Sequence, residues 1–250
     1  KSFAEYFTSR GYVVFGNDII SHGRSNTQKS LGLYFTDWRN VYDDAEKARE
    51  YVQEKYPGLP VYILGFSLGS YVVRTMGSLL PYKKEILIGT GDQQEMLMKL
   101  MQKKISKKYA GKMAYISDDI KELLFGSYAK KFPGKPENYW LLTDDEKRSE
   151  YEEDRLVKTS VTPGFFCEFL KGMELASIHL NMPNNTIPTM FMYGENDPVS
   201  GFGKGIQKVY KKYKKRNPST EIMSFPGTHD ILHDAGYEHV FEEIYKFIES

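Results

Sequence analysis

A serine stands between two glycines in GFSLG (residues 65–69), directly after the apolar run Val61–Leu64. Serine is a weak nucleophile until a neighbouring base removes its hydroxyl proton. A sharp turn from a strand into a helix would expose the hydroxyl of Ser67 and aim the helix N-terminus at negative charge that develops during attack. The flanking glycines are expected because larger side chains would collide with the strand and the helix. We predict that Ser67 is a nucleophile, with a purely structural turn as the alternative.

A serine on such a turn is followed along the chain by an acid and then by a histidine. Asp197 lies in the loop after the apolar run TMFMY, and His229 follows the next apolar run and a Pro-Gly turn. His229 would take the proton from Ser67 and deliver it to the leaving group, while Asp197 fixes the tautomer of the imidazole. Glu195 is the alternative acid and His233 the alternative base.

Further residues are expected to help this triad. The backbone N–H of Leu68 would supply one donor to an oxyanion hole, and a single such donor is typically worth about 10² to 10³ in rate. Phe66 and Val199 are predicted to contact the substrate.

Short apolar runs bounded by turn residues alternate with stretches of helical periodicity along most of the 250 residues. Strands are predicted over the apolar runs Gly11–Asp18, Pro60–Phe66, Lys84–Asp92, Ile187–Asp197 and Thr220–Gly227. Helices are predicted at the opening of the chain, over Asp37–Tyr56, over Leu68–Leu80 and after each of the last two strands. This alternation predicts an α/β fold whose mainly parallel sheet carries helices on both faces.

The alternation stops between residues 93 and 185, where the patterns are helical. We interpret this block as an inserted helical cap, so that residues 1–92 and 186–250 form two parts of one core. Periodicity places Leu97, Leu100, Met101 and Ile105 on one face of a cap helix and most of its lysines on the other. The apolar cap helices could shelter an acyl chain, or they could simply cover the sheet.

Charge is nearly balanced over the whole chain but not within the cap. Lysine and arginine total 34 against 33 acidic residues, so the net charge of +1 offers no pull toward nucleic acid. From residue 94 to 136, ten lysines stand against four acidic residues, a local charge of +6. This stretch could bring the cap into transient contact with an anionic lipid surface, or it could be a solvated helix face.

The single cysteine and the short apolar runs exclude other classes of protein. One cysteine allows neither an internal disulfide nor a cysteine-based zinc site. Cys167 lies among bulky apolar residues in PGFFCEFL, which disfavour a reactive thiolate. A lone cysteine fits a reducing compartment, so we expect a cytoplasmic protein. The apolar runs fall far short of the roughly 18 residues that a membrane span needs.

These motifs resemble the α/β-hydrolase superfamily and, within it, the monoacylglycerol lipase and lysophospholipase group, also described as serine aminopeptidase-like hydrolases. NDIISHGRSN (residues 17–26) resembles the group's D-x-x-x-H-G-x-S loop, GFSLGS (65–70) its elbow, GENDPVSGFGKGIQKVY (194–210) its acid loop and PGTHDILHD (226–234) its histidine loop. WLLTDDEKRSEYEEDRL and TPGFF resemble cap segments of bacterial members. The resemblance implies hydrolysis of carboxylic esters that carry acyl chains, without cofactor or metal.

The chain departs from the group's pattern at several positions. Phe66 stands where the group often has histidine, and Asp230 stands where it often has glutamate. One residue separates Gly227 from His229 where relatives often have two. Members also carry early strands and a His-Gly loop that supplies the second oxyanion donor. His22-Gly23 matches the structural H-G-x-S loop instead, with an oxyanion role as the alternative.

The early strands of the group have no counterpart in the sequence. By family topology one of them lies between the strands predicted over Gly11–Asp18 and Pro60–Phe66, and without it both would carry unpaired backbone groups. We therefore expect roughly fifty residues upstream of Lys1 on family grounds, which would bring the N-terminal strands and the second oxyanion donor.

The predicted function is a serine ester hydrolase that cleaves monoacylglycerols, lysophospholipids or simple acyl esters through an acyl-enzyme. A peptidase that releases N-terminal residues is one alternative, and it would need an acidic pocket for the substrate amine. A catalytically silent hydrolase fold that serves as a binding module is another. Dehalogenases are disfavoured because they use aspartate at the position of Ser67.

Overall fold

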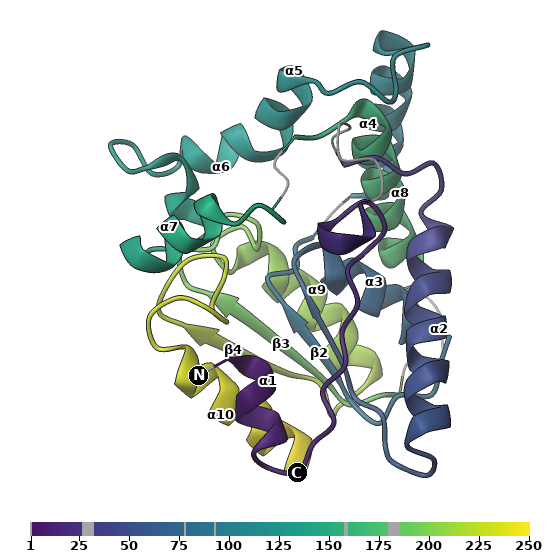
Figure 1. Ribbon diagram of the computed structural model, residues 1–250, viewed down its shortest axis with the longest axis vertical. Helices are drawn as coiled ribbons and strands as arrows, with labels where there is room; N and C mark the ends of the chain where they lie inside the picture. Colours follow the sequence, from purple (N-terminus) through teal and green to yellow (C-terminus); the bar gives the residue numbers. More distant parts are fainter. Residues whose placement is uncertain (1, 27–32, 78, 93, 158–159, 180–185) are drawn as a thin grey trace.

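A parallel sheet lies at the centre of the molecule (Figure 1). The computed structural model describes residues 2–26, 33–77, 79–92, 94–157, 160–179 and 186–250. Within these residues the sheet has four strands in the order β1-β2-β3-β4, and every neighbouring pair is parallel. The strands are β1 (Ile63–Phe66), β2 (Glu85–Ile88), β3 (Thr189–Gly194) and β4 (Glu221–Phe225). Four of the five predicted strands and the parallel pairing are therefore confirmed.

Helices cover both faces of this sheet, as the alternating pattern predicts. The described helices of this part are α1 (Phe3–Thr8), α2 (Arg39–Lys55), α3 (Leu68–Met76), α9 (Lys204–Arg216) and α10 (Tyr237–Glu249), with a short 3₁₀ turn, η1 (Gly23–Ser25). In Figure 1, α1 and α10 lie together on one side of the sheet, and α3 and α9 lie on the other.

The two covered faces follow from the strand period of two residues. Ile86 and Ile88 of β2 point to one face, where they pack in a cluster with Phe241 of α10. Leu87, between them, points to the opposite face and packs with Val73 of α3 and with side chains of α9. Because both faces are buried, Ile86, Leu87 and Ile88 form a continuous apolar run instead of alternating with polar residues.

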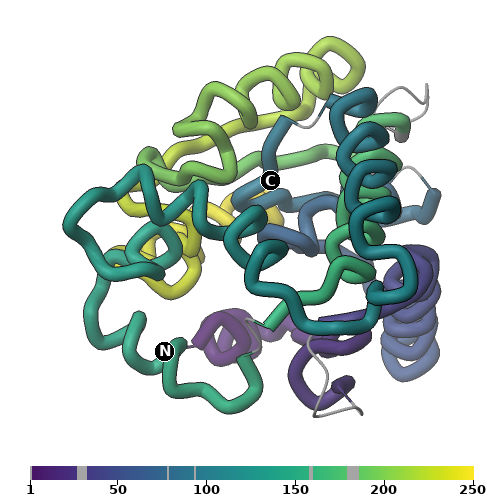
Figure 2. Tube along the Cα trace, turned by 90° about the horizontal axis from the view of Figure 1, so that it is seen from above, coloured from purple at the N-terminus to yellow at the C-terminus, as the bar shows by residue number. Residues whose placement is uncertain are grey.

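A helical layer, here called the cap (residues 94–179), lies over the carboxyl ends of the strands (Figures 1 and 2). Its elements are α4 (Glu95–Lys108), α5 (Asp118–Lys121), the π-helical turn η2 (Glu122–Gly126), α6 (Ser127–Ala129), the 3₁₀ turn η3 (Glu137–Trp140), α7 (Asp145–Glu153) and α8 (Pro163–His179). Residues 93 and 185, the expected boundaries of the insertion, lie outside the described residues. The three-part division of the chain stays a prediction.

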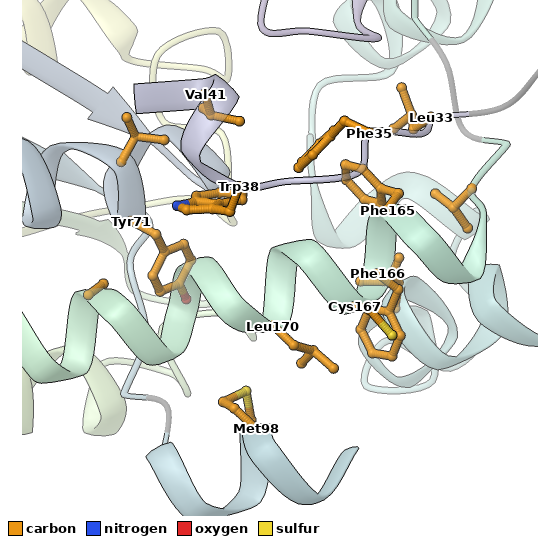
Figure 3. Packing of buried hydrophobic residues seen from close by; sticks show 14 of the residues in the cluster. Leu33, Phe35, Trp38, Val41, Tyr71, Met98, Phe165, Phe166, Cys167 and Leu170 are labelled. Carbon is orange, nitrogen blue, oxygen red and sulfur yellow. The ribbon is translucent and has the colours of Figure 1, made fainter. Parts of the chain in front are cut away.

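α8 joins the cap to the helices below it through one apolar cluster (Figure 3). Phe165 and Leu170 of α8 share this cluster with Met98 of α4, Tyr71 of α3 and Trp38, the residue before α2. Trp38 and Tyr71 are at most 1% exposed. The cap is therefore packed against the core and does not stand apart from it.

The apolar residues that periodicity places on one face of α4 are not equally buried. Ile105 is buried, but Leu97 is 50% exposed and Leu100 is 60% exposed. α8 packs against the side of α4 that carries Met98 and Ile105, which leaves the Leu97–Leu100 side uncovered.

The predicted strand over Gly11–Asp18 is also wrong. This segment runs alongside the sheet in Figure 1, yet it pairs with none of the described strands. Its side chains are not buried either, since Val13 is 44% exposed and Phe15 is 47% exposed. An extended segment becomes a strand only when a neighbouring backbone completes its hydrogen-bond ladder, and here β1 is too far away to do so.

An apolar groove of about 940 Å³ separates that segment from β1. On one edge of β1, the N–H groups of Ile63 and Ser67 donate to carbonyls of Lys84 and Ile88 on the β2 side. Because backbone groups alternate between the two edges of a strand, the N–H and C=O of Leu64 face the groove instead. Side chains from α2 and from the segment after α1 form the other walls. The strand expected between these segments stays a prediction.

Candidate active site

Ser67 occupies the sharp turn between β1 and α3. Its backbone has φ 51° and ψ −116°, a conformation that residues with a side chain rarely adopt. Such strain costs on the order of 1–3 kcal/mol and persists only where neighbouring contacts hold it. The N–H of Ser67 donates to the carbonyl of Ile88 at 2.9 Å, and the hydroxyl of Ser70 donates to the carbonyl of Ser67 at 2.6 Å. The predicted turn from strand to helix is therefore present.

The two glycines that flank Ser67 have different roles in the structure. A Cβ on Gly65 would collide with the backbone carbonyl of Gly69 and would lie 2.7 Å from Cγ2 of Val73. A Cβ on Gly69 would meet no heavy atom within 4 Å. The expectation that both glycines prevent a collision is thus correct for Gly65 and wrong for Gly69, because the side-chain direction at Gly69 is open.

The acid loop (residues 195–203) follows β3 and brings Asp197 beneath the histidine. Asp197 is fully buried, and its Oδ1 accepts the N–H of Val199 at 2.8 Å. The same Oδ1 lies 3.0 Å from Nδ1 of His229. Glu195, the alternative acid, is exposed, and its carboxylate accepts a hydrogen bond from Ser224 instead. The structure therefore brings Asp197, and not Glu195, to the imidazole.

The histidine loop (residues 226–236) follows β4 and places His229 between the acid and the serine. Nε2 of His229 lies 2.8 Å from Oγ of Ser67, although the two residues are 162 positions apart. Because Nδ1 faces a carboxylate, the neutral imidazole carries its proton on Nδ1 and presents Nε2 as the acceptor for the serine hydroxyl. The three residues singled out from the sequence thus form one hydrogen-bonded line.

Two glycines at strand ends give the histidine loop its room, and the sequence analysis missed both. A Cβ on Gly89, directly after β2, would lie 2.7 Å from Cε1 of His229. A Cβ on Gly194, at the end of β3, would collide with the carbonyl of Thr228. In the sequence, each of these glycines directly follows the apolar residues of a predicted strand, and this position could have indicated that a neighbouring loop packs closely there.

Aromatic rings pack against the imidazole. The ring of Phe66 lies 4.9 Å from that of His229, centroid to centroid, and the ring of Trp140 lies 5.6 Å away. Phe66 therefore packs on His229, and its predicted contact with substrate stays a prediction, as does that of Val199. The side chain of Val199 packs against the cap cluster that contains Trp140. Trp140 opens a segment that resembles a cap, but that resemblance did not place it against His229.

Burial raises the pKa values of Tyr128 and of Cys167. Burial, with a smaller contribution from the charge of Asp197, raises the pKa of Tyr128 to about 12, so its hydroxyl stays neutral over the usual working range. Burial also raises the pKa of the Cys167 thiol, which agrees with the prediction of an unreactive cysteine.

His22 and Gly23 form a structural loop at the base of the cap. Burial lowers the pKa of His22, its Nδ1 lies 3.1 Å from the carbonyl of Ile20, and its ring packs against Phe165. The carboxylate of Asp18 accepts the N–H of Arg24 at 2.8 Å and closes the loop. These contacts favour the structural interpretation of the motif over an oxyanion role.

The model of the family described as serine aminopeptidase, S33, matches residues 1–236. The chain belongs to this family. It is similar to the monoglyceride lipase homolog of Monkeypox virus, with 24% identity over 250 residues that cover 99% of this chain and 81% of the relative.

Solved structures agree on the fold. A thermostable carboxyl esterase from Bacillus coagulans superposes with a TM-score of 0.88 at 22% identity, over 99% of this chain and 83% of the esterase. The monoacylglycerol lipase of Paleococcus ferrophilus superposes with a TM-score of 0.71 at 16% identity, over 98% of this chain and 86% of the lipase. The fold is thus that of the α/β-hydrolases, as the motifs predict.

Alanine substitutions at Gly65 and Gly69 form a matched pair, because a Cβ would collide with its neighbours only at Gly65. Gly65→Ala should lower the melting temperature and remove any reactivity of Ser67, because β1 and α3 must move apart to admit the methyl group. Gly69→Ala should leave the melting temperature unchanged or slightly raised, since alanine favours a helix over glycine by up to about 1 kcal/mol. Thermal unfolding of both variants measures this, and equal losses would contradict the asymmetry.

His233, the alternative base, pairs with Asp230 and not with Ser67. Its Nδ1 lies 2.9 Å from Oδ2 of Asp230, and this hydrogen bond raises the pKa of His233 despite the opposing effects of burial and, to a smaller extent, of the charge of Lys147. A raised pKa in the folded state adds stability below the ordinary histidine pKa of about 6.5 and loses it as the pH rises through the folded value.

His233→Gln should therefore lower the melting temperature at pH 5.5 but not at pH 9. The effect should be small, because the His233 side chain is 63% exposed. His239→Gln is the control for loss of an exposed histidine, since Nδ1 of His239 forms only an ion pair without a hydrogen bond, at 4.0 Å from Oε1 of Glu243. Melting temperatures across this pH range measure the difference, and a His233→Gln effect that grows with pH would contradict the assignment.

Proposed function

We propose that the chain is a serine ester hydrolase in which Ser67 is the nucleophile, His229 the general base and Asp197 the orienting acid. The observation that carries this proposal is the hydrogen-bonded line through the three side chains. Oγ of Ser67 lies 2.8 Å from Nε2 of His229, and Nδ1 of His229 lies 3.0 Å from Oδ1 of Asp197. Both distances are within the range at which a base can activate a hydroxyl and be oriented by a third group.

The proposed reaction proceeds in two halves. Oγ of Ser67 attacks the ester carbonyl carbon while Nε2 of His229 takes the hydroxyl proton, and the carbonyl oxygen becomes an oxyanion. When the C–O bond to the alcohol breaks, His229 gives that proton to the leaving oxygen and an acyl-enzyme remains. Water then attacks the acyl carbon, again through His229, which releases the acid and returns the proton to Ser67. Water is the only co-reactant required.

The helix that begins after Ser67 is suited to hold the oxyanion. Leu68 is the first residue of α3, so its N–H has no acceptor within the helix and lies at the positive end of the helix dipole. This supports the predicted role of the Leu68 N–H as one oxyanion donor. A second donor upstream of Lys1 stays a prediction.

Monoacylglycerols, lysophospholipids or simple acyl esters are the proposed substrates. The similar proteins carry the names monoglyceride lipase homolog, carboxyl esterase and monoacylglycerol lipase. The groups packed against His229 are the aromatic rings of Phe66 and Trp140, which favour an apolar acyl chain. A peptidase would need an acidic pocket for the substrate amine, whereas the rings of Phe66 and Trp140 that pack on His229 carry no charge.

A serine-directed label tests the proposed function. The wild-type protein should react with a fluorophosphonate, and Ser67→Ala should abolish the label and lower ester turnover by at least about 10³-fold. Ser149→Ala, which changes an exposed serine on α7, should keep both. Labelled protein on a gel and a panel of acyl esters and aminoacyl amides measure this.

Two other outcomes of this experiment would favour the binding module or the peptidase. Labelling that persists in Ser67→Ala, or no labelling at all, would favour the silent binding module. Faster turnover of aminoacyl amides than of esters would favour the peptidase.

We also propose that α4 contacts a lipid surface that holds the substrate. Met96 is 76% exposed, and it shares one side of the helix with the exposed Leu97 and Leu100. Lys103 and Lys104 continue this side one turn further on, and both are exposed. An apolar patch followed by lysines fits the boundary of an anionic membrane. In the described part of the chain, the helices are all too short or too polar to cross a bilayer.

Polar substitutions on α4 should weaken binding to lipid vesicles without changing the rate of ester hydrolysis. The double variant Leu97→Ser/Leu100→Ser should bind anionic vesicles about tenfold more weakly, because it removes exposed apolar area, and should hydrolyse a dissolved short-chain ester at the wild-type rate. Leu123→Ser is the control, since Leu123 is 46% exposed elsewhere on the cap. Vesicle co-sedimentation measures the binding, and equal binding by all three proteins would contradict the proposal.

A further inference from the structure

The backbone of the proposed base is held by the cap. The N–H of His229 donates to the carbonyl of Trp140 at 3.1 Å, and the N–H of Asp230 donates to the carbonyl of Leu141 at 2.9 Å. These two bonds join the histidine loop to a cap segment about 90 positions earlier in the chain. The position of the imidazole therefore depends on where residues 140 and 141 lie.

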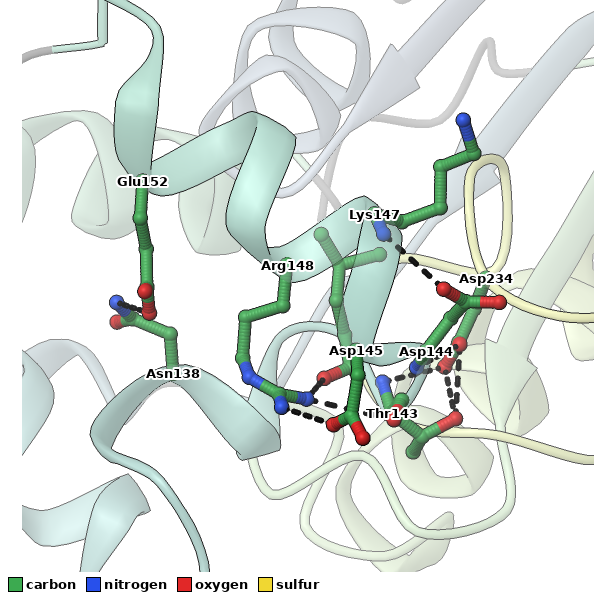
Figure 4. A network of polar contacts seen from close by, with 9 residues as sticks. Asn138, Thr143, Asp144, Asp145, Lys147, Arg148, Glu152 and Asp234 are labelled. Atoms are coloured by element: carbon green, nitrogen blue, oxygen red, sulfur yellow. Dashed lines mark hydrogen bonds and ion pairs between the residues drawn. The ribbon is translucent and has the colours of Figure 1, made fainter.

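A buried carboxylate fixes the next residues of the same segment (Figure 4). Asp234, at the far end of the histidine loop, is 1% exposed. It accepts the backbone N–H of Thr143 and that of Asp144, each at 3.0 Å, and the hydroxyl of Thr143 at 2.8 Å. A buried carboxylate is costly unless several donors satisfy it, so this arrangement strongly favours the docked cap segment.

A cation holds the opposite side of this segment. Arg148 of α7 donates to the carbonyl of Leu142 at 3.1 Å and to that of Thr143 at 3.3 Å. Peptide N–H groups thus face the negative Asp234 while peptide carbonyls face the positive Arg148, which matches the direction of the peptide dipoles. The segment is clamped between the two charges.

The clamp also places the aromatic ring that covers the base. Trp140 is 7% exposed and packs on His229, with Phe125 and Tyr128 behind it. A shift of residues 140–144 would move this ring and both carbonyl acceptors of the histidine loop together.

We propose that Asp234 is a positioning residue, which keeps His229 aligned between Ser67 and Asp197 by docking cap residues 140–144 onto the histidine loop. This inference rests on the proposed ester hydrolysis, in which His229 accepts and returns a proton in each half-reaction. Misplacement of a reacting group by about 1 Å can cost on the order of 10² in rate, so loosening the dock should slow the chemical step more than substrate binding.

Two substitutions test the dock, and two more serve as matched controls. Asp234→Asn keeps the size of the side chain but puts an amide N–H₂ where an oxygen accepts. Thr143→Val removes only the hydroxyl that bonds Asp234, whereas Thr143→Ser retains it. Glu146→Gln removes an exposed carboxylate on α7 without touching the dock.

Steady-state kinetics on a dissolved short-chain ester should separate these variants. Asp234→Asn should lower kcat about tenfold or more with KM within about twofold, and Thr143→Val should show a smaller loss of the same kind. Thr143→Ser and Glu146→Gln should match the wild type. The downfield proton resonance of the Nδ1–H shared by His229 and Asp197 should broaden or shift in Asp234→Asn and stay in place in the controls.

Titration of reactive Ser67 with a fluorophosphonate distinguishes positioning from loss of folded protein. A wild-type kcat per labelled site in folded Asp234→Asn, with the downfield resonance unchanged, would overturn the proposal. If Asp234→Asn does not fold, an unchanged kcat and resonance in Thr143→Val would overturn it. Failure of the wild-type protein to label at Ser67 would instead overturn the proposed function.

Discussion

The close approach of β1 and α3 is the constraint on which the candidate site depends. Only a glycine at position 65 lets the carbonyl of Gly69 come so near the strand. That contact, together with the Ser67 N–H bond to β2, holds the serine in a backbone conformation that it would otherwise leave. The direction of Oγ and the position of the Leu68 N–H at the helix end both follow from this single turn.

Parallel pairing then brings the other two side chains to the same edge. The carboxyl ends of β1, β3 and β4 lie together, so the loops after them meet above the sheet. Glycines at the ends of β2 and β3 leave the space that His229 and its loop occupy. The site is built from loops, but its geometry is set by the rigid strands that end in them.

The parts of the structure that were predictable from the sequence are those with a local signal. The apolar runs of four strands, the GFSLG turn and the order of Asp197 and His229 were all readable as short patterns. The strand expected over Gly11–Asp18 was not formed, because pairing depends on a neighbour that the apolar pattern cannot report. Periodicity likewise groups Leu97 and Leu100 on one face of α4 but cannot report whether that face is covered, since the packing of α8 decides this.

The contacts between the cap and the histidine loop carried no sequence signal at all. Thr143 and Asp234 are 91 positions apart, and the motifs that contain them do not indicate that the two residues meet. Helical periodicity and turn residues describe each segment separately and say nothing about such a pairing. Only the packed structure shows that these two loops share a hydrogen-bond network.

The two backbone bonds from His229 and Asp230 to the cap bear on how this fold can be re-engineered. A cap inserted in a core can be exchanged between relatives in order to change which substrates reach the serine. Here Trp140 and Leu141 lie within the cap in the sequence, yet their carbonyls accept hydrogen bonds from the histidine loop of the core. A sound junction for such a chimera would therefore keep residues 140–144 with the recipient core and exchange only the helices on either side.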